Sequence, residues 1–273
     1  MKIRAVAAVA KKDLTQMVRY PTWIIELFIL PLIFPLAYIL SANGLAGPSG
    51  EGFQSFAAKA GTDQIVGYLV IGSMIWMMVN FTMWNYGSYL RDEQLRGTLE
   101  SNWLCPINKF DILIGGSVIS FVIVVISIIA SILEYRFVYR IYFTGNVFSW
   151  ILVFVSLLPG IYGIGTILAS LVLKLKEVNA AVNVARGLMM ILCGISFPIS
   201  VMPHFMQVMA KFIPYTFGIE AARQVMLMDS GIKGASGNIL ICLIEGIVYM
   251  IIGRLVFISV ENGVKEAGSL DRF

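Results

Sequence analysis

The chain has 273 residues, of which 58% are hydrophobic and 13% charged, and its mean hydropathy is +0.83. Soluble domains carry about 25% charged residues, so this composition excludes an ordinary cytosolic enzyme, a disordered protein and a collagen-like fibre. The net charge of +4 is spread among apolar segments, which argues against a nucleic acid partner. The composition indicates an integral membrane protein.

The first twenty residues predict an amphipathic helix. In residues 1–20, apolar side chains recur at helical spacing on one side and basic side chains lie on the other. Such a helix lies in the membrane interface. A cleaved signal peptide is the alternative, but the apolar run that follows, 23–40, is longer than the usual signal core of about 7–15 residues. We therefore expect an uncleaved interfacial helix.

Six apolar stretches predict six transmembrane helices. Each is about 20 residues long, which at 1.5 Å per residue is enough to cross a hydrocarbon core of about 30 Å. The backbone groups of a segment in lipid must be satisfied internally, so helices are expected. The predicted spans are 23–40, 65–86, 112–133, 147–173, 178–197 and 239–258. We expect an all-α integral membrane fold in which residues 1–273 form a single transmembrane domain.

The basic residues predict the orientation in the membrane. If the N-terminus is cytoplasmic, 14 of the 20 Lys and Arg residues lie in cytoplasmic segments or at cytoplasmic helix ends. The other six are Lys59, Arg136, Arg140, Lys211, Arg223 and Lys233. Because cytoplasmic loops carry the excess of basic residues, both termini are expected in the cytoplasm of a multi-pass protein of the cell membrane.

The segment between the fifth and sixth predicted spans, 198–237, is partly apolar and interrupted by prolines. It contains two short helix-like stretches, around 205–212 and 216–228, and neither is long enough to cross a membrane. We expect an external re-entrant helical hairpin, because irregular backbone is tolerated at membrane depth where protein shields it. A seventh span is the alternative, and it would place the C-terminus outside.

A charged loop, 88–109, connects the second and third predicted spans. A short helix is expected to end at Pro106, and Asn108 is expected to cap the helix that follows. From charge alone, the segment is either a solvated loop or a compact helical knob that docks on a soluble partner. The chain contains no phosphate-loop or other catalytic motif. We therefore expect no enzyme activity and no bound cofactor or metal in this chain.

Within this loop, the string Glu93-x-x-x-Gly97-Thr98-Leu99-Glu100 resembles the signature of ABC-2-type transporter permeases, the membrane subunits of ATP-driven exporters. The amphipathic N-terminal helix and the proline-rich region 198–237 also resemble parts of that family, so the resemblance covers essentially the whole chain. It implies that the loop is a coupling helix seated on an ATPase subunit, which uses ATP and Mg²⁺. The implied coupling residues are Arg91, Asp92, Glu93, Arg96, Gly97, Thr98, Leu99 and Glu100.

Two spans carry a polar and aromatic face. These faces consist of Ser73, Trp76, Asn80, Trp84 and Gly87 in the second span, and of Asn179, Asn183, Arg186, Gly187, Met190 and Gly194 in the fifth. Polar groups are costly in lipid, so both faces should turn toward protein or water. They either pack helices together or line a substrate path or dimer seam, as the family's second and fifth helices do.

Glu245 is an acidic residue deep in the sixth span. A charge at the centre of a membrane helix costs roughly 2.5–3.5 kcal/mol on insertion scales. We expect a structural hydrogen bond to a neighbouring helix, with a proton relay as the alternative.

Together these features favour the permease of an ABC exporter of the drug- or lipid-exporting branch. It would act in the lipid membrane as a homodimer or a pseudo-symmetric pair with two ATPase copies, and move an amphipathic, drug-like or lipid-linked solute outward. A polysaccharide exporter is the alternative within that family. Outside it, the alternatives are an ion- or proton-coupled secondary transporter or channel that uses Glu245, and a membrane scaffold or sensor without transport.

Overall fold

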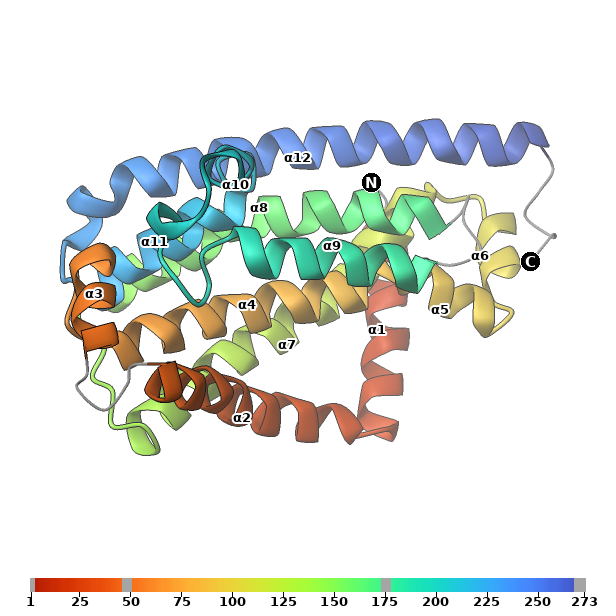
Figure 1. The fold of residues 1–273 in the computed structure, drawn as a ribbon. Helices are drawn as coiled ribbons and strands as arrows, with labels where there is room; N and C mark the ends of the chain where they lie inside the picture. The colour runs from red at the N-terminus through yellow and green to blue at the C-terminus, as the bar shows by residue number, and fades with distance from the viewer. Residues whose placement is uncertain (1–2, 46–50, 173–177, 268–273) are drawn as a thin grey trace.

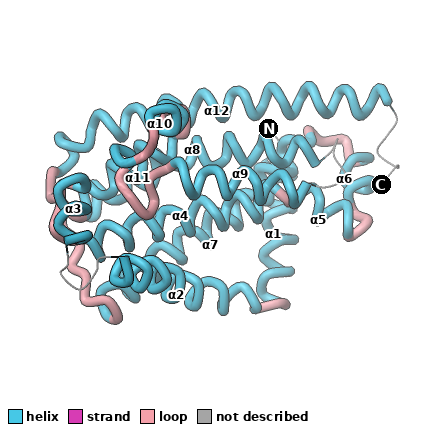
Figure 2. The backbone as a smooth tube through the Cα atoms, in the orientation of Figure 1, coloured by secondary structure: helices cyan, strands magenta, loops and turns pink. Residues whose placement is uncertain are grey.

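The computed structural model describes residues 3–45, 51–172 and 178–267, and all regular structure within those ranges is helical (Figures 1 and 2). The long helices are α2 (Thr22–Leu45), α4 (Ile65–Gly87), α7 (Lys109–Phe137), α8 (Val147–Val172) and α12 (Gly231–Ala267). The other helices are α1 (Ile3–Arg19), α3 (Glu51–Ala60), α5 (Tyr89–Leu95), α6 (Leu99–Leu104), α9 (Val178–Leu192), η1 (Ile199–Val201), α10 (His204–Ala210) and α11 (Pro214–Met226). The expected all-α fold is confirmed for this part of the chain.

Within the described ranges, five helices are long and apolar enough to cross a membrane: α2, α4, α7, α8 and α12. The fifth predicted span, 178–197, is shorter than expected, because α9 has 15 residues and ends at Leu192. The apolar sequence continues past Leu192, but Gly194 adopts a φ of +69°, a left-handed conformation that ends a helix. Residue 173, the last residue of the fourth predicted span, lies outside the described residues.

The long helices run roughly along one direction, and the short ones gather at the two ends of the bundle (Figure 1). α5 and α6 lie at one end, which we call the α5/α6 end, together with α1 and the C-terminal end of α12. At the opposite end, which we call the α3/α11 end, lie α3 and α11. α1 crosses the direction of the long helices, as expected for a helix that lies in a membrane interface.

Helices α8 and α12 form the closest helix pair of the bundle, and glycines make this approach possible. A Cβ atom at Gly163 would lie 2.5 Å from the backbone nitrogen of Met250, and one at Gly253 would lie 2.6 Å from the carbonyl oxygen of Gly163. Small residues that let helix backbones touch are the usual packing device of membrane helices. α12 has 37 residues, and so is about 56 Å long.

The region 198–237 contains the two short helices that the sequence predicts, α10 and α11. The helix α12 begins at Gly231, before the end of this region, so residues 231–237 are already helical. The first turns of α12 are rich in small and polar residues, so a hydrophobicity pattern does not mark them as part of the span, although the backbone is already helical there.

Arg223 of α11, which the sequence places among the external basic residues, is 2% exposed. Its guanidinium donates hydrogen bonds to the carbonyl oxygens of Gly194, at 2.8 Å, and Ile195, at 2.7 Å, just beyond the end of α9. It also stacks on the ring of Tyr68 in α4, with 3.4 Å to the ring centroid. We call these four residues the Arg223 clamp. The clamp joins α11, α4 and the end of α9, so Arg223 is not a free external charge.

Candidate functional site

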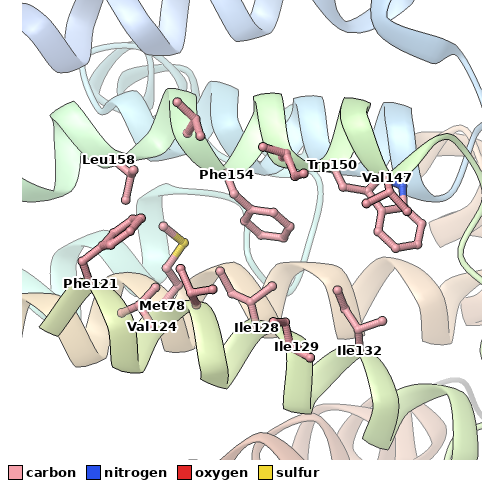
Figure 3. A pocket seen from close by; sticks show the side chains of 13 residues that line it. Met78, Phe121, Val124, Ile128, Ile129, Ile132, Val147, Trp150, Phe154 and Leu158 are labelled. Atoms are coloured by element: carbon pink, nitrogen blue, oxygen red, sulfur yellow. The ribbon is translucent and has the colours of Figure 1, made fainter. Parts of the chain in front are cut away.

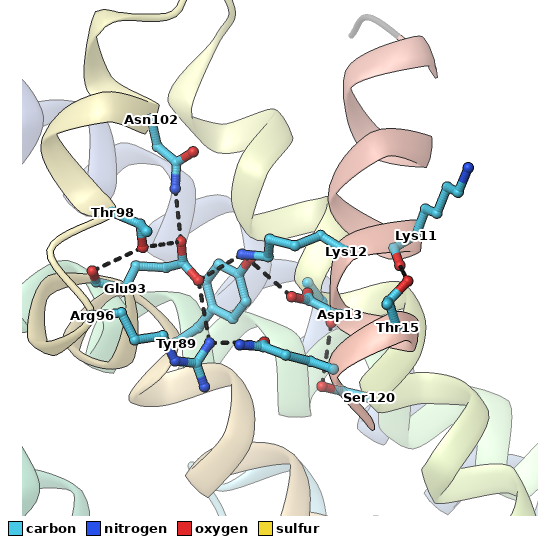
Figure 4. Close-up of polar contacts among 12 residues, drawn as sticks. Lys11, Lys12, Asp13, Thr15, Tyr89, Glu93, Arg96, Thr98, Asn102 and Ser120 are labelled. Carbon is cyan, nitrogen blue, oxygen red and sulfur yellow. Dashed lines mark hydrogen bonds and ion pairs between the residues drawn. The ribbon is translucent and has the colours of Figure 1, made fainter. Parts of the chain in front are cut away.

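A buried carboxylate connects α1 to the short helices at the α5/α6 end (Figure 4). Glu93 of α5 is 1% exposed. Its Oε1 accepts a hydrogen bond from Nζ of Lys12, at 2.6 Å, and lies 3.5 Å from Nη1 of Arg96. Its Oε2 accepts hydrogen bonds from Oγ1 of Thr98, at 2.8 Å, and Nδ2 of Asn102, at 2.7 Å. We call these five residues the Glu93 junction.

The local sequence explains how α5 and α6 fold around Glu93. Gly97 has a φ of +67° and lies in open space, so the chain turns there without steric cost. The backbone nitrogen of Thr98 then donates to the carbonyl oxygen of Glu93, at 3.0 Å, and closes the turn. Residues 93–98 therefore include a turn at Gly97, and this turn brings the Thr98 hydroxyl within hydrogen-bond distance of the Glu93 carboxylate.

The surroundings keep Glu93 ionised. Burial alone would raise its pKa, but the hydrogen bonds from Lys12 and Thr98 and the charges of Lys12 and Arg96 together hold the pKa below its usual value. The neighbouring carboxyls behave differently, because burial raises the pKa of Asp13 and of Asp92. Glu93 is therefore a fixed negative charge at this end of the bundle.

Two further contacts attach α1 to the rest of the protein. Nη1 of Arg96 donates to Oε1 of Gln16, at 3.0 Å. Nζ of Lys12 lies 5.4 Å from the ring centroid of Tyr89, and that ring packs against Gly116 of α7. α1 is thereby connected to both α5 and α7. The sequence does not single out Lys12 among the basic residues of α1, because its partner Glu93 is 81 residues away.

The predicted coupling residues divide into buried and accessible groups. Glu93 and Leu99 are buried, so they do not reach an outer surface, and the Glu93 carboxylate is already occupied inside the chain. Arg91 and Asp92 are half-buried, and Arg91 donates to Oε1 of Gln94. The exposed members are Arg96, Gly97 and Thr98. The side chain of Glu100 lies outside the described residues.

Two leucines that the sequence analysis did not single out are the most exposed apolar residues of α5 and α6. Leu95 is 70% exposed and Leu104 is 87% exposed. Together they give this end of the bundle an apolar surface.

The two predicted polar faces meet through Arg186 of α9. Its Nε donates to Oδ1 of Asn80 on α4, and its Nη1 donates to Oδ1 of Asn183, at 3.0 Å. The same guanidinium lies 5.2 Å from the ring centroid of Trp84, which is 41% exposed. We call these four residues the Arg186 cluster. It lies partly at the surface of the single chain, so lipid, water or protein must cover it.

The other residues of these faces are placed differently. Ser73 and Trp76 are buried in the core of the single chain, where Oγ of Ser73 donates to the carbonyl oxygen of Val70. Met190 is 38% exposed. The side chain of Asn179 lies outside the described residues. That these residues pack helices together, or line a substrate path or dimer seam, stays a prediction.

Glu245 is half-buried in α12. Its Oε2 is buried, and the part of the chain that the structure describes offers that atom no hydrogen-bond partner. The expected hydrogen bond to a neighbouring helix is therefore missing at this oxygen.

A polar cavity of about 530 Å³ lies beside the Glu93 junction, between α1, α2, α4, α5 and α7. Its lining combines the carboxyls of Asp13 and Asp92 with the aromatic rings of Trp23 and Tyr89. No group of three His, Cys, Asp or Glu side chains within the described ranges is placed to hold a metal ion.

A family model described as ABC-2 family transporter protein matches residues 52–255. The matched range is three quarters of the chain, and it contains every member of the Glu93 junction except Lys12. Comparison with curated proteins found no match.

Proposed function

Because the chain belongs to the ABC-2 family of transporter proteins, we propose that this multi-pass permease serves an ATP-driven exporter. In this proposal it moves an amphipathic, drug-like or lipid-linked solute out of the cytoplasm or the inner leaflet. Separate ABC ATPase subunits bind ATP and Mg²⁺, and this chain itself catalyses no reaction. The Glu93 junction is the observation that carries the proposal, because it fastens the two short helices α5 and α6 to the interfacial helix α1.

The proposed docking surface is the outer side of α5 and α6. Leu95 and Leu104 are exposed there, and an apolar surface outside the membrane is stabilised when a partner covers it. Arg96 and Thr98 border that surface and are also exposed. Glu93 does not touch the ATPase in this proposal. It holds the docking helices in place from inside.

Movement of the ATPases would reach the membrane along two connections. One is the backbone, since α5 follows α4 with Ser88 as the only residue between them. The other is the Glu93 junction, which carries a displacement of α5 to α1 through the contacts of Lys12 and Arg96. A push on α5 would thus move an interfacial helix and a spanning helix together.

The proposed membrane arrangement has six spans, with α9 as the short fifth one, and the region from η1 to α11 as an external re-entrant hairpin. Both termini are then in the cytoplasm of a cell-membrane protein. Two permease copies pair with two ATPase copies. The Arg186 cluster supports such pairing, because an arginine and an asparagine facing lipid would be costly unless a second copy or a water-filled path covers them.

An amphipathic cargo fits the polar cavity beside the Glu93 junction. Its lining combines the carboxyls of Asp13 and Asp92 and the guanidinium of Arg96 with aromatic rings, which suits a solute with a polar group and an apolar body. The cavity lies at the interfacial helix, where such solutes concentrate in a membrane. The second candidate function, a proton-coupled transporter, is favoured by one observation, the unpartnered buried Oε2 of Glu245.

The test is co-purification of the tagged chain with its ATPase in mild detergent, followed by ATP-driven transport in vesicles. Leu95→Asp and Leu104→Asp should each weaken binding of the ATPase about tenfold or more, because each removes a leucine side chain from the interface and adds a charge. Gln54→Asp is the matched control, since Gln54 is exposed on α3 at the other end of the bundle.

Normal ATPase binding by both leucine variants would refute the docking surface. Transport that needs no ATPase and is abolished by Glu245→Gln would favour the proton-coupled alternative.

A further inference from the structure

An apolar groove runs between α7 and α8 (Figure 3). It encloses about 370 Å³, and every residue that lines it is aliphatic, aromatic or methionine. Its sides are open, because Ile129 of α7 and Ile151 of α8 are 55% and 52% exposed. The groove therefore faces the surrounding membrane and is not an internal void.

The length of the groove matches one leaflet of a bilayer. On α7 its lining extends from Phe121 to Ile132, and on α8 from Val147 to Leu158. Eleven residues of helical rise make about 16 Å, which is close to half of a hydrocarbon core of about 30 Å. In Figure 3, Phe121 lies opposite Leu158 at one end of the groove, and Ile132 and Val147 lie at the other.

The end of the groove at Ile132 and Val147 is basic. The residues Val125, Ile129, Ile132 and Arg136 follow one another at intervals of four, three and four, so they share one face of α7. Arg136 therefore continues the groove face one turn beyond its apolar part. Arg140 follows in the connection to α8, and both arginine side chains are exposed.

Aromatic residues mark this end as the level of the lipid headgroups. The indole nitrogen of Trp150 donates to the carbonyl oxygen of Thr144, at 2.9 Å, and the guanidinium of Arg136 lies 5.4 Å from the ring centroid of Tyr142. Tyrosine and tryptophan concentrate at membrane–water interfaces. The acidic Glu134 is two positions before Arg136, which places it on roughly the opposite side of α7.

We propose that this groove is a binding site for one phospholipid with an anionic headgroup. An acyl chain lies between α7 and α8, and the phosphate contacts Arg136 and Arg140. The lipid belongs to the leaflet at the α3/α11 end, which is the outer leaflet in the orientation proposed above. Because lipid tails are as apolar as the groove, shape and headgroup charge select the occupant.

A second copy of this chain fits the groove less well. Two copies related by a two-fold axis along the membrane normal bring the same residues of each copy to the same level. Arg136 and Arg140 would then face the arginines of the other copy, and like charges across an interface oppose association.

The first test is native mass spectrometry of the detergent-solubilised protein after incubation with equal amounts of phosphatidylglycerol and phosphatidylcholine. The wild type should retain phosphatidylglycerol in preference. Arg136→Gln and Arg140→Gln should each lower the ratio of bound phosphatidylglycerol to phosphatidylcholine about fivefold, the effect of one basic residue near an anionic headgroup. Lys233→Gln is the control, because Lys233 is exposed near the same end of the bundle, on α12 and away from the groove. Ratios unchanged by both arginine substitutions would overturn the proposal.

The second test fills the groove. Ile151→Trp should remove most of the bound lipid of either kind, and Val155→Phe serves the same purpose if the tryptophan variant does not fold. Ile251→Trp is the control, since Ile251 is 55% exposed on α12 outside the groove. Lipid retention equal to that of the control would overturn the proposal, and so would dissociation of paired copies in the groove variants. Bound lipid is measured on the permease alone, so a failure here is distinguishable from a failure to bind the ATPase.

Discussion

Glu93 at one end of the bundle and Arg223 at the other are both deeply buried charged side chains, and the two differ in what surrounds them. Arg223 is 2% exposed and is held by backbone carbonyl oxygens and the ring of Tyr68. Glu93 is 1% exposed and is held by the side chains of α1, α5 and α6. Two of those side chains, Lys12 and Arg96, are themselves 41% and 46% exposed.

This difference separates a fixed contact from an adjustable one. The carbonyls around Arg223 belong to the backbone and cannot turn away, so the clamp stabilises one arrangement of α4, α9 and α11. Lys12 and Arg96 can rotate into water or toward a partner, because solvent already surrounds part of each side chain. We therefore expect changes at Arg223 to affect folding, and changes at the Glu93 junction to affect coupling to the ATPase.

The largest effect is expected from Arg223→Gln. The substitution leaves buried carbonyl oxygens of Gly194 and Ile195 without donors, at about 1–3 kcal/mol for each unsatisfied group. The folded fraction after detergent extraction should drop, as measured by size-exclusion chromatography and thermal unfolding. Arg223→Lys keeps the charge but has fewer hydrogen-bond donors. Its thermal stability should therefore lie between those of the wild type and Arg223→Gln. Unchanged thermal stability of Arg223→Gln would contradict a structural role for the clamp.

The next largest effect is expected from Glu93→Gln. Glutamine has nearly the same shape but lacks the charge, so its hydrogen bonds with Lys12 and Thr98 lose the strength of charge-assisted ones, about 2 kcal/mol in total. The protein should fold, while ATP-driven transport and ATPase binding decrease about tenfold or more. Size-exclusion chromatography checks folding, and binding is measured with the purified ATPase. If Glu93→Gln unfolded as Arg223→Gln is expected to, the proposed difference between a structural role for Arg223 and a coupling role for Glu93 would be contradicted.

A smaller effect is expected from Lys12→Met, which keeps the length of the side chain and removes its charge. Because Lys12 is partly exposed, the loss should be about 1 kcal/mol or less, measured as weaker coupling between ATP hydrolysis and transport. Lys11→Met is the matched control, since Lys11 is an exposed lysine next in sequence on the same helix. Equal effects of both substitutions would indicate that only the net charge of α1 matters.

The smallest effect is expected from pH. The pKa of Glu93 in the folded protein is below its usual value of 4.5, so its ionised form stabilises the junction above that pH, and this stabilisation is lost as the pH decreases further. The raised pKa values of Asp13 and Asp92 act in the opposite direction. Thermal unfolding of the wild type and Glu93→Gln should therefore be compared at pH 7, 5 and 4. The difference between them should be constant from pH 7 to 5 and decrease at pH 4.

The sequence predicts the parts of this protein that depend on local pattern. The amphipathic α1, the cap of α7 by Asn108 and the two short helices of the region 198–237 all follow from residue types at fixed spacing. In the structure, Oδ1 of Asn108 accepts from the backbone nitrogen of Phe110, at 3.0 Å. Hydrophobicity predicts where the spans lie better than it predicts their ends. The end of a helix depends on the backbone conformation of residues such as Gly194, which hydrophobicity does not show.

The candidate site could be predicted only in part. The resemblance locates the charged loop and implies that Glu93 lies at or beside the contact with the ATPase, but it does not indicate the contacts of the carboxylate within the chain. The partner Lys12 is 81 residues away, and no local pattern connects the two. Arg223 was placed among external charges for the same reason, since its acceptors are carbonyls that sequence does not identify. Long-range polar contacts therefore need the structure.

The length of α12 has a mechanical consequence. A helix of about 56 Å behaves as a nearly rigid rod, and its close packing on α8 at Gly163 and Gly253 provides a pivot. A tilt of roughly 5° about that pivot displaces one end relative to the other by about 5 Å, the rise of a single helical turn. α12 can thus act as a lever arm that converts a small rotation in the membrane into a large displacement at its ends.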